Sequence, residues 1–236
     1  MRTALQTPKI CVSLAAESVD ILRRDVDRAL ERADYAEVRF DYLAKGEIEE
    51  AVRAVEDRKD RLVFTLRSEV EGGRYAGPQE EYAEIVSTLG QAKPMLLDVE
   101  MERSEPALDR LAHYDWDRVI VSHHDTNGTP GNLEGLLDRM QWMSNFVKIV
   151  TTANTERDVD RIIRIYDYPY IGRPTNLVAF AMGELGVRSR ILAGLRPNSP
   201  FTFAALDRPV APGQLSVEQM RMEYETLRGF PYLPFL

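Results

Sequence analysis

The feature that most constrains the fold of this chain is a regular alternation of short apolar runs with longer, charge-rich amphipathic segments. The runs with the length and composition of β-strands lie at 9–14, 35–40, 61–67, 94–100, 117–124, 145–152, 175–182 and 200–206. Segments with helical periodicity lie at 17–32, 47–58, 79–90, 132–143, 155–166 and 216–228. Alternation of this kind predicts a parallel sheet covered by helices.

The length of 236 residues suits one α/β barrel as well as two small domains, and an open doubly wound sheet would also fit the alternation. No break in composition and no Gly/Ser-rich linker divides the chain. Eight strand-and-helix units in a chain of this size favour a closed barrel. We therefore predict a single (β/α)8 TIM barrel domain over residues 1–236.

Composition excludes several classes of protein. A formal net charge of -8 argues against a general nucleic-acid binder, so an anionic ligand would need a local cluster of arginines. Cys11 is the only cysteine, which rules out an intrachain disulfide and any cysteine-based zinc site and fits a reducing cytosol. The first residues lack the apolar stretch of a signal peptide, and no later segment has the length of a membrane span. We expect a soluble, cytoplasmic protein with no nucleic-acid or membrane partner.

Four neighbouring predicted strands place polar residues on one face near their carboxyl ends, because successive strand residues point to opposite faces. The residues that share this face are Glu37, Arg39, Asp41, Thr65, Arg67, Asp98, Glu100, Ser122 and His124. Barrel enzymes collect their functional groups at this end. The repetition from strand to strand favours a converging polar site over solvated strand ends.

Lys148 lies in the middle of the apolar run 146–150, and it is the candidate nucleophile. Burial disfavours the charged form of an amine, and the neutral amine attacks carbonyl carbons. The alternative is a lysine that reaches solvent along its apolar stem or pairs with an acid.

Of the three histidines, His113 lies in a helix-to-loop stretch and is expected at the surface. His123 and His124 are adjacent, so only one can face the barrel interior. Alternation places His124 inside, one strand before Lys148, where a neutral imidazole can shuttle a proton beside an imine.

A hydrogen-bonded core histidine or a metal ligand is the alternative for His124. Oxygens for a metal site could come from Glu71, Asp98 and Glu100. The interleaved Arg39 and Arg67 would oppose a dication. We therefore predict no metal.

Six sequence blocks then resemble a known family in their order and spacing. They are E-V-R-F-D (37–41), T-L-R-S-E-V-E-G-G (65–73), S-H-H-D (122–125), V-K-I (147–149), M-G-E-L-G-V-R-S-R (182–190) and A-P-G-Q (211–214). Together they look like type I 3-dehydroquinate dehydratase over nearly the full chain. The resemblance implies a cofactor-free syn dehydration of 3-dehydroquinate to 3-dehydroshikimate in the shikimate pathway, by a homodimer.

The resemblance also implies roles for individual residues. Lys148 matches the Schiff-base lysine, His124 the general acid/base, and Glu71 the carboxylate that orients the histidine. The residues that match substrate-binding positions are Glu37, Arg39, Arg67, Arg190, Gln214, Met182 and, more weakly, Ser13. Arg190 matches the arginine that clamps the substrate carboxylate, a task that suits a planar guanidinium.

The sequence departs from the family at Val210, where the family has a small hydroxyl residue directly before A-P-G-Q. Residues 207–215 are predicted to form a lid loop, so the departure concerns the lid contact and leaves the mechanism intact. A class I aldolase or another Schiff-base barrel lyase would share Lys148, and a barrel that has lost catalysis would share the fold. The blocks around His124, Glu71 and Gln214 argue against the first, and retention of both Lys148 and His124 argues against the second.

Overall fold

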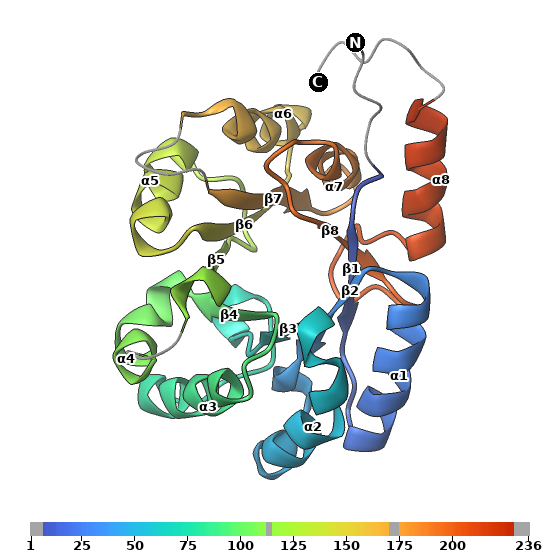
Figure 1. Ribbon diagram of the computed structural model, residues 1–236. Coiled ribbons are helices and arrows are strands. Elements are labelled where there is room, and N and C mark those ends of the chain that lie inside the picture. The colour runs from blue at the N-terminus through green and yellow to red at the C-terminus, as the bar shows by residue number, and fades with distance from the viewer. Residues whose placement is uncertain (1–6, 112–114, 170–174, 229–236) are drawn as a thin grey trace.

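The computed structural model describes residues 7–111, 115–169 and 175–228, and His113 lies outside this part of the chain. Eight parallel strands form a nearly closed barrel, and helices surround it (Figure 1). The predicted (β/α)8 fold is confirmed.

The strands follow the predicted order and are buried on both faces, as expected for a parallel barrel. Their bounds are β1 Ile10–Leu14, β2 Tyr35–Arg39, β3 Leu62–Thr65, β4 Leu96–Glu100, β5 Val119–His124, β6 Phe146–Thr152, β7 Asn176–Met182 and β8 Thr202–Ala205. The sheet order is β7-β6-β5-β4-β3-β2-β1-β8. Among the described residues no backbone ladder joins β7 to β8. Phe180 and Phe203 pack across this seam, with ring centroids 6.1 Å apart.

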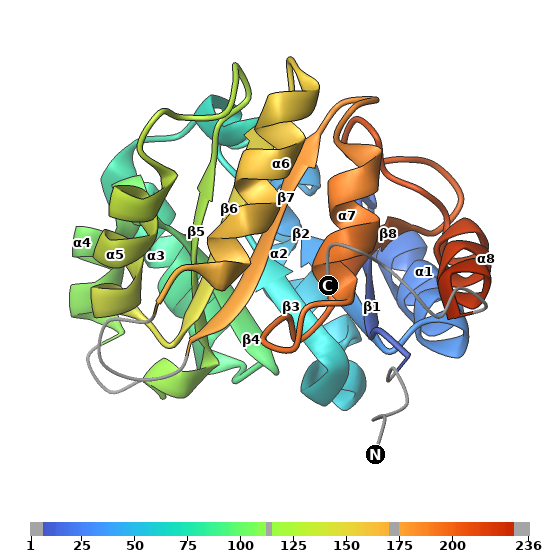
Figure 2. The same ribbon diagram turned by 90° about the horizontal axis from the view of Figure 1, so that it is seen from above.

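The helices lie outside the strands, as Figure 2 shows for α5, α6 and α7. Their bounds are α1 Val19–Arg32, α2 Ile48–Ala54, α3 Gln79–Gln91, α4 Ser104–Arg110, α5 Leu133–Met143, α6 Glu156–Arg164, α7 Val187–Gly194 and α8 Val217–Arg228. In the described parts of the chain, none of them is both long and apolar enough to cross a bilayer.

Local sequence explains where several helices begin. The hydroxyl of Ser18 accepts a hydrogen bond from the backbone of Ile21 at the start of α1. Thr155 and Asp158 form a reciprocal capping box at the start of α6. Buried residues then recur at helical spacing, which turns one face of each helix toward the barrel wall.

The structure differs from the predicted elements at a few places. The helices α4 and α7 were not predicted, since each is only 7 or 8 residues long and shows no extended apolar period. The third strand ends at Thr65, before Arg67, because the backbone N–H of Arg67 donates to the Asp41 side chain and does not join a ladder. The helix predicted over 47–58 ends at Ala54, and a 3-10 helix, Glu56–Arg61, follows.

Candidate active site

The register of the strands brings the inward-facing polar residues together at the carboxyl end of the barrel. Ser13 on β1 lies beside Glu37 on β2, and Ser122 on β5 lies beside Lys148 on β6. A cavity of about 320 Å³ opens at this end. All ten residues predicted for the site line this cavity: Ser13, Glu37, Arg39, Arg67, Glu71, His124, Lys148, Met182, Arg190 and Gln214.

Lys148 is buried, with 4% of its surface exposed, so it does not reach solvent along its stem. Instead it pairs with acidic side chains, which was the second alternative that the sequence left open for this lysine. Its Nζ lies 2.9 Å from Glu37 Oε1 and 3.2 Å from Asp98 Oδ2, and 4.3 Å from the centre of the Phe203 ring. The amine therefore stands at the floor of the cavity as one member of a compensated charge cluster.

Nearby cations keep the two partners of Lys148 ionised. Burial by itself would raise the pKa of the Glu37 carboxyl, but Lys148 and Arg39 outweigh it and the pKa is lowered. Burial likewise opposes ionisation of Asp98, and here Arg67 and Lys148 lower the pKa.

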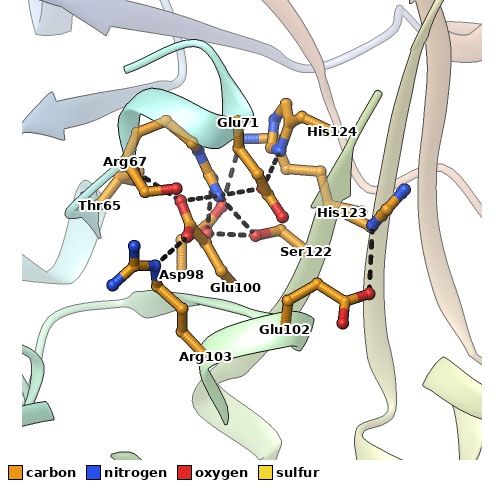
Figure 3. Close-up of polar contacts among 12 residues, drawn as sticks. Thr65, Arg67, Glu71, Asp98, Glu100, Glu102, Arg103, Ser122, His123 and His124 are labelled. Atoms are coloured by element: carbon orange, nitrogen blue, oxygen red, sulfur yellow. Dashed lines mark hydrogen bonds and ion pairs between the residues drawn. The ribbon is translucent and has the colours of Figure 1, made fainter. Parts of the chain in front are cut away.

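His124 faces the cavity and His123 does not, as strand alternation predicts. His124 Nδ1 lies 2.9 Å from Glu71 Oε2, whereas the His123 side chain is turned toward Glu102, 3.9 Å away (Figure 3). Burial and the cationic charge of Arg67 lower the pKa of His124 well below its ordinary value. The imidazole is therefore neutral at pH 7, as a proton acceptor must be.

Glu71 lies in a short 3-10 helix, Glu69–Glu71, that follows β3. Burial raises the pKa of its carboxyl to about 8, even though Arg67 favours the charged form. Glu71 and His124 thus form a pair in which the acid holds a proton near neutral pH and the histidine does not.

Arg67 lies at the centre of the polar cluster in Figure 3. Its Nη1 donates to Glu71, Glu100 and Ser122, at 2.9, 3.1 and 3.0 Å, and its Nη2 donates to Asp98 at 2.7 Å. The side chain is 3% exposed. Arg67 lines the cavity, but its guanidinium is occupied in holding the carboxylates that surround the reactive groups.

The hydrogen bonds of Arg67 also argue against the alternative in which His124 and nearby carboxylates bind a metal ion. Glu71, Asp98 and Glu100, which could have supplied metal oxygens, all accept hydrogen bonds from Arg67. In residues 7–111, 115–169 and 175–228, no group of three His, Cys, Asp or Glu residues is arranged to hold a metal ion. The chemistry of this donor set does not fit a dication.

Two further arginines reach the cavity. Arg39 forms a bidentate pair with Asp41, at 2.8 and 2.7 Å, which fixes its planar head at the end of β2. Arg190 on α7 pairs with no carboxylate among the described residues, and its Nε has no partner there. Burial lowers its pKa to about 9, which still leaves the guanidinium charged at pH 7. Its uncompensated charge makes it the natural receptor for an anion.

The loop 207–215 closes one side of the cavity. Gln214 is 8% exposed, and its side chain contacts both Val210 and Ser13. Gly213 adopts a φ of 74°, and a Cβ at this position would lie 2.3 Å from the Gly183 carbonyl oxygen. Only glycine fits there.

Sequence reasoning missed the place of Asp98 and Phe203 beside Lys148. Alternation had put Asp98 on the inner face, so its proximity to Lys148 could have been inferred from that pattern. Phe203 lies in an apolar strand, where nothing in the sequence distinguishes a ring that faces the site from one that faces the core.

The fold and the site together define a (β/α)8 barrel enzyme, with reactive groups gathered at the carboxyl ends of the strands. A model of the family described as type I 3-dehydroquinase matches residues 10–231. The chain belongs to this family.

Individual relatives agree. A 3-dehydroquinate dehydratase of Thermococcus gammatolerans is 40% identical over 203 residues, 84% of this chain and 89% of the relative. One of Pyrococcus abyssi is 35% identical over 211 residues, 86% of this chain and 94% of the relative. A crystal structure of the type I enzyme of Clostridium difficile, with covalently modified comenic acid, superimposes with a TM-score of 0.81 at 24% identity. It covers 94% of this chain and 93% of the other, and supports the fold.

Proposed function

We propose that this protein catalyses the cofactor-free syn dehydration of 3-dehydroquinate to 3-dehydroshikimate, a step of the shikimate pathway, through a Schiff base on Lys148. The observation that carries the proposal is one cavity that holds a buried lysine, a neutral histidine and an arginine that has no carboxylate partner in the part of the chain that the structure describes. These three groups match a ketone, an acidic C–H and a carboxylate on one small substrate.

The reaction begins when the ammonium group of Lys148 gives one proton to a neighbouring base, and the amine then attacks the substrate ketone and forms a C–N bond. This proton and a second proton from the nitrogen leave with the ketone oxygen as water, and a protonated imine remains. Glu37 and Asp98 accept hydrogen bonds from Lys148 and hold the amine in place before the attack.

His124 then takes a proton from the carbon next to the imine, which the positive nitrogen has made acidic. The electron pair of that C–H bond forms the new double bond as the hydroxyl leaves, and His124 returns a proton so that the group departs as water. Glu71 fixes the orientation of the imidazole through its contact with Nδ1. Hydrolysis of the imine releases the product and regenerates Lys148.

The remaining residues of the cavity bind the substrate in this proposal. Arg190 binds the carboxylate, because it is a buried cation that pairs with no acidic side chain in the described ranges. The hydroxyl groups of the substrate are bound by four polar side chains that line the cavity, those of Ser13, Glu37, Arg39 and Gln214. The apolar side chain of Met182 covers the ring of the substrate. Arg67, which lines the same cavity, contacts the substrate as well and holds Glu71 and Asp98 through its Nη1 and Nη2.

Borohydride reduction tests the proposal directly. Treatment with borohydride and 3-dehydroquinate should inactivate the protein and add the mass of a reduced substrate adduct at Lys148, located by peptide mass spectrometry. Lys148→Met, which keeps the length of the side chain without its amine, should show neither adduct nor turnover. A fully active Lys148→Met protein would refute the Schiff base, and an adduct formed equally well with aldol substrates would favour a class I aldolase.

Metal independence is a separate expectation, since amine, imidazole and guanidinium supply every step. Activity should survive exhaustive chelation. Loss of activity with rescue by a divalent ion would return Glu71, Asp98 and Glu100 to the role of metal ligands. A cytoplasmic location and a homodimeric state stay predictions.

A further inference from the structure

A chain of hydrogen bonds connects the lid loop with Lys148 through Ser13. Gln214 Nε2 donates to Ser13 Oγ at 3.2 Å, and Ser13 Oγ donates to Glu37 Oε2 at 2.9 Å. Through its other oxygen, Glu37 accepts from Lys148 Nζ at 2.9 Å. All four side chains are buried, and hydrogen bonds between buried groups are stronger than those in bulk water.

The chemistry of each group fixes the direction of this chain. A carboxylate only accepts, so Ser13 must donate its single proton to Glu37 and must accept from Gln214. The amide of Gln214 cannot be turned over, because its Oε1 accepts from the backbone N–H of Val210 at 2.8 Å. The lid is thus tied to Glu37 by one hydroxyl group.

We propose that Ser13 is a positioning residue that couples closure of the lid loop to the chemical state of Lys148. The inference rests on the proposed Schiff base. An ammonium group has three N–H donors, and a protonated imine has one. Lys148 donates to both Glu37 and Asp98 in the free protein, so formation of the imine releases at least one of these bonds.

The release strengthens the rest of the chain. With fewer N–H donors from Lys148, the negative charge of the Glu37 and Asp98 carboxylates is less well compensated. Glu37 then attracts the Ser13 proton more strongly. The Ser13 oxygen then becomes a better acceptor for Gln214, because consecutive hydrogen bonds polarise one another. Formation of the imine therefore tightens the lid, and the closed lid keeps Glu37 turned toward the nucleophile.

Thr65 offers a matched control. Its hydroxyl donates to Glu37 Oε1 at 3.1 Å, and the side chain is fully buried. Thr65→Val removes a donor from the same carboxylate as Ser13→Ala does, with little change in volume. The hydroxyl of Thr65 has no hydrogen bond to the lid, so only Ser13→Ala breaks the connection.

Hydrogen exchange of residues 207–215 in the ligand-free, full-length protein measures the coupling. Ser13→Ala should accelerate exchange of this segment by about two- to tenfold, the ratio that corresponds to one ordinary hydrogen bond. The Val210 amide, which Gln214 protects, should respond most. Thr65→Val should not accelerate this exchange, and equal acceleration by the two substitutions would overturn the proposal.

A double-mutant cycle tests whether the signal passes through Ser13. Glu37 has no hydrogen bond to the lid among the described contacts, yet Glu37→Gln should accelerate exchange of the loop in the wild-type background. It should have no further effect when Ser13 is already alanine. An undiminished effect in that background would show that Glu37 acts on the loop by another route. If Ser13→Ala fails to fold, Gln214→Met gives the same cycle from the lid side.

Steady-state kinetics with 3-dehydroquinate separates coupling from a general loss of structure. Ser13→Ala should raise KM by a larger factor than it lowers kcat, because the lid binds the substrate while Lys148 and His124 remain in place. The borohydride adduct should still form at Lys148. No adduct in the wild-type protein would refute the proposed function, whereas an adduct together with an unaltered lid in Ser13→Ala would refute the coupling alone.

Discussion

His123 and His124 are neighbours in the sequence but lie on opposite sides of the barrel wall. We expect His124→Ala to lower kcat by about two to four orders of magnitude, the range of general acid/base catalysis, while still forming the borohydride adduct slowly. His123→Ala, the matched control, should stay within a few-fold of the wild type in steady-state assays. The reverse pair of phenotypes would contradict the assignment of His124 as the proton shuttle.

Glu71 gives a pH-dependent prediction for stability. Folding raises the pKa of its carboxyl from 4.5 to about 8, so the folded protein holds this proton more tightly than the unfolded chain does. The resulting stabilisation is present below pH 4.5 and is lost as the pH rises through about 8. Glu71→Gln, which is neutral at every pH, should therefore gain thermal stability relative to the wild type between pH 5 and pH 9. Melting curves across this range check the sign, and a relative loss would contradict it.

At the scale of elements, the lid loop shows how a departure from the family pattern is accommodated. The side chain of Val210 offers no hydroxyl, but its backbone N–H orients Gln214. Gln214→Ala should raise KM with little change in the rate of imine formation. Val210→Ser should lower KM by restoring a polar contact to the substrate. Steady-state kinetics and borohydride trapping measure the two quantities separately, and an unchanged KM in both variants would show that the loop does not act as a lid.

For the whole molecule, aromatic packing around Phe201, at the amino ends of the strands, contributes to stability. Phe201, directly before β8, is 2% exposed and contacts the rings of Tyr35, Phe146 and Phe203, with centroids 5.5 to 5.8 Å apart. Phe201→Ala should lower the free energy of unfolding by about 3–5 kcal/mol. Because Phe201 does not line the cavity, kcat/KM at 25 °C should change by less than about threefold.

Denaturant unfolding and steady-state kinetics test this separation of stability from function. Met222 is the control, since it is 67% exposed on α8 and its replacement by alanine should change the free energy of unfolding by less than about 0.5 kcal/mol. A Phe201→Ala protein that keeps full stability would show that this end of the barrel is held by other contacts.

The sequence by itself determined the barrel, the inner face of its strands and the family. Strand alternation is a local property, so it placed His124 inside and His123 outside without knowledge of their neighbours. The same local pattern located the polar ends of four adjacent strands. The short helix α7 was not predicted, because it has too few residues to show a helical repeat of apolar side chains.

Only the tertiary structure decided what each inward-facing residue contacts. Lys148 pairs with Glu37 across 111 positions of sequence, and Gln214 reaches Ser13 across 201. Arg67 matches a substrate-contacting residue in the sequence, and only the folded chain shows that its Nη1 and Nη2 also donate to Glu71, Asp98, Glu100 and Ser122. Hydrogen bonds depend on distances of tenths of an ångström between distant segments, and these are fixed only when the whole barrel packs.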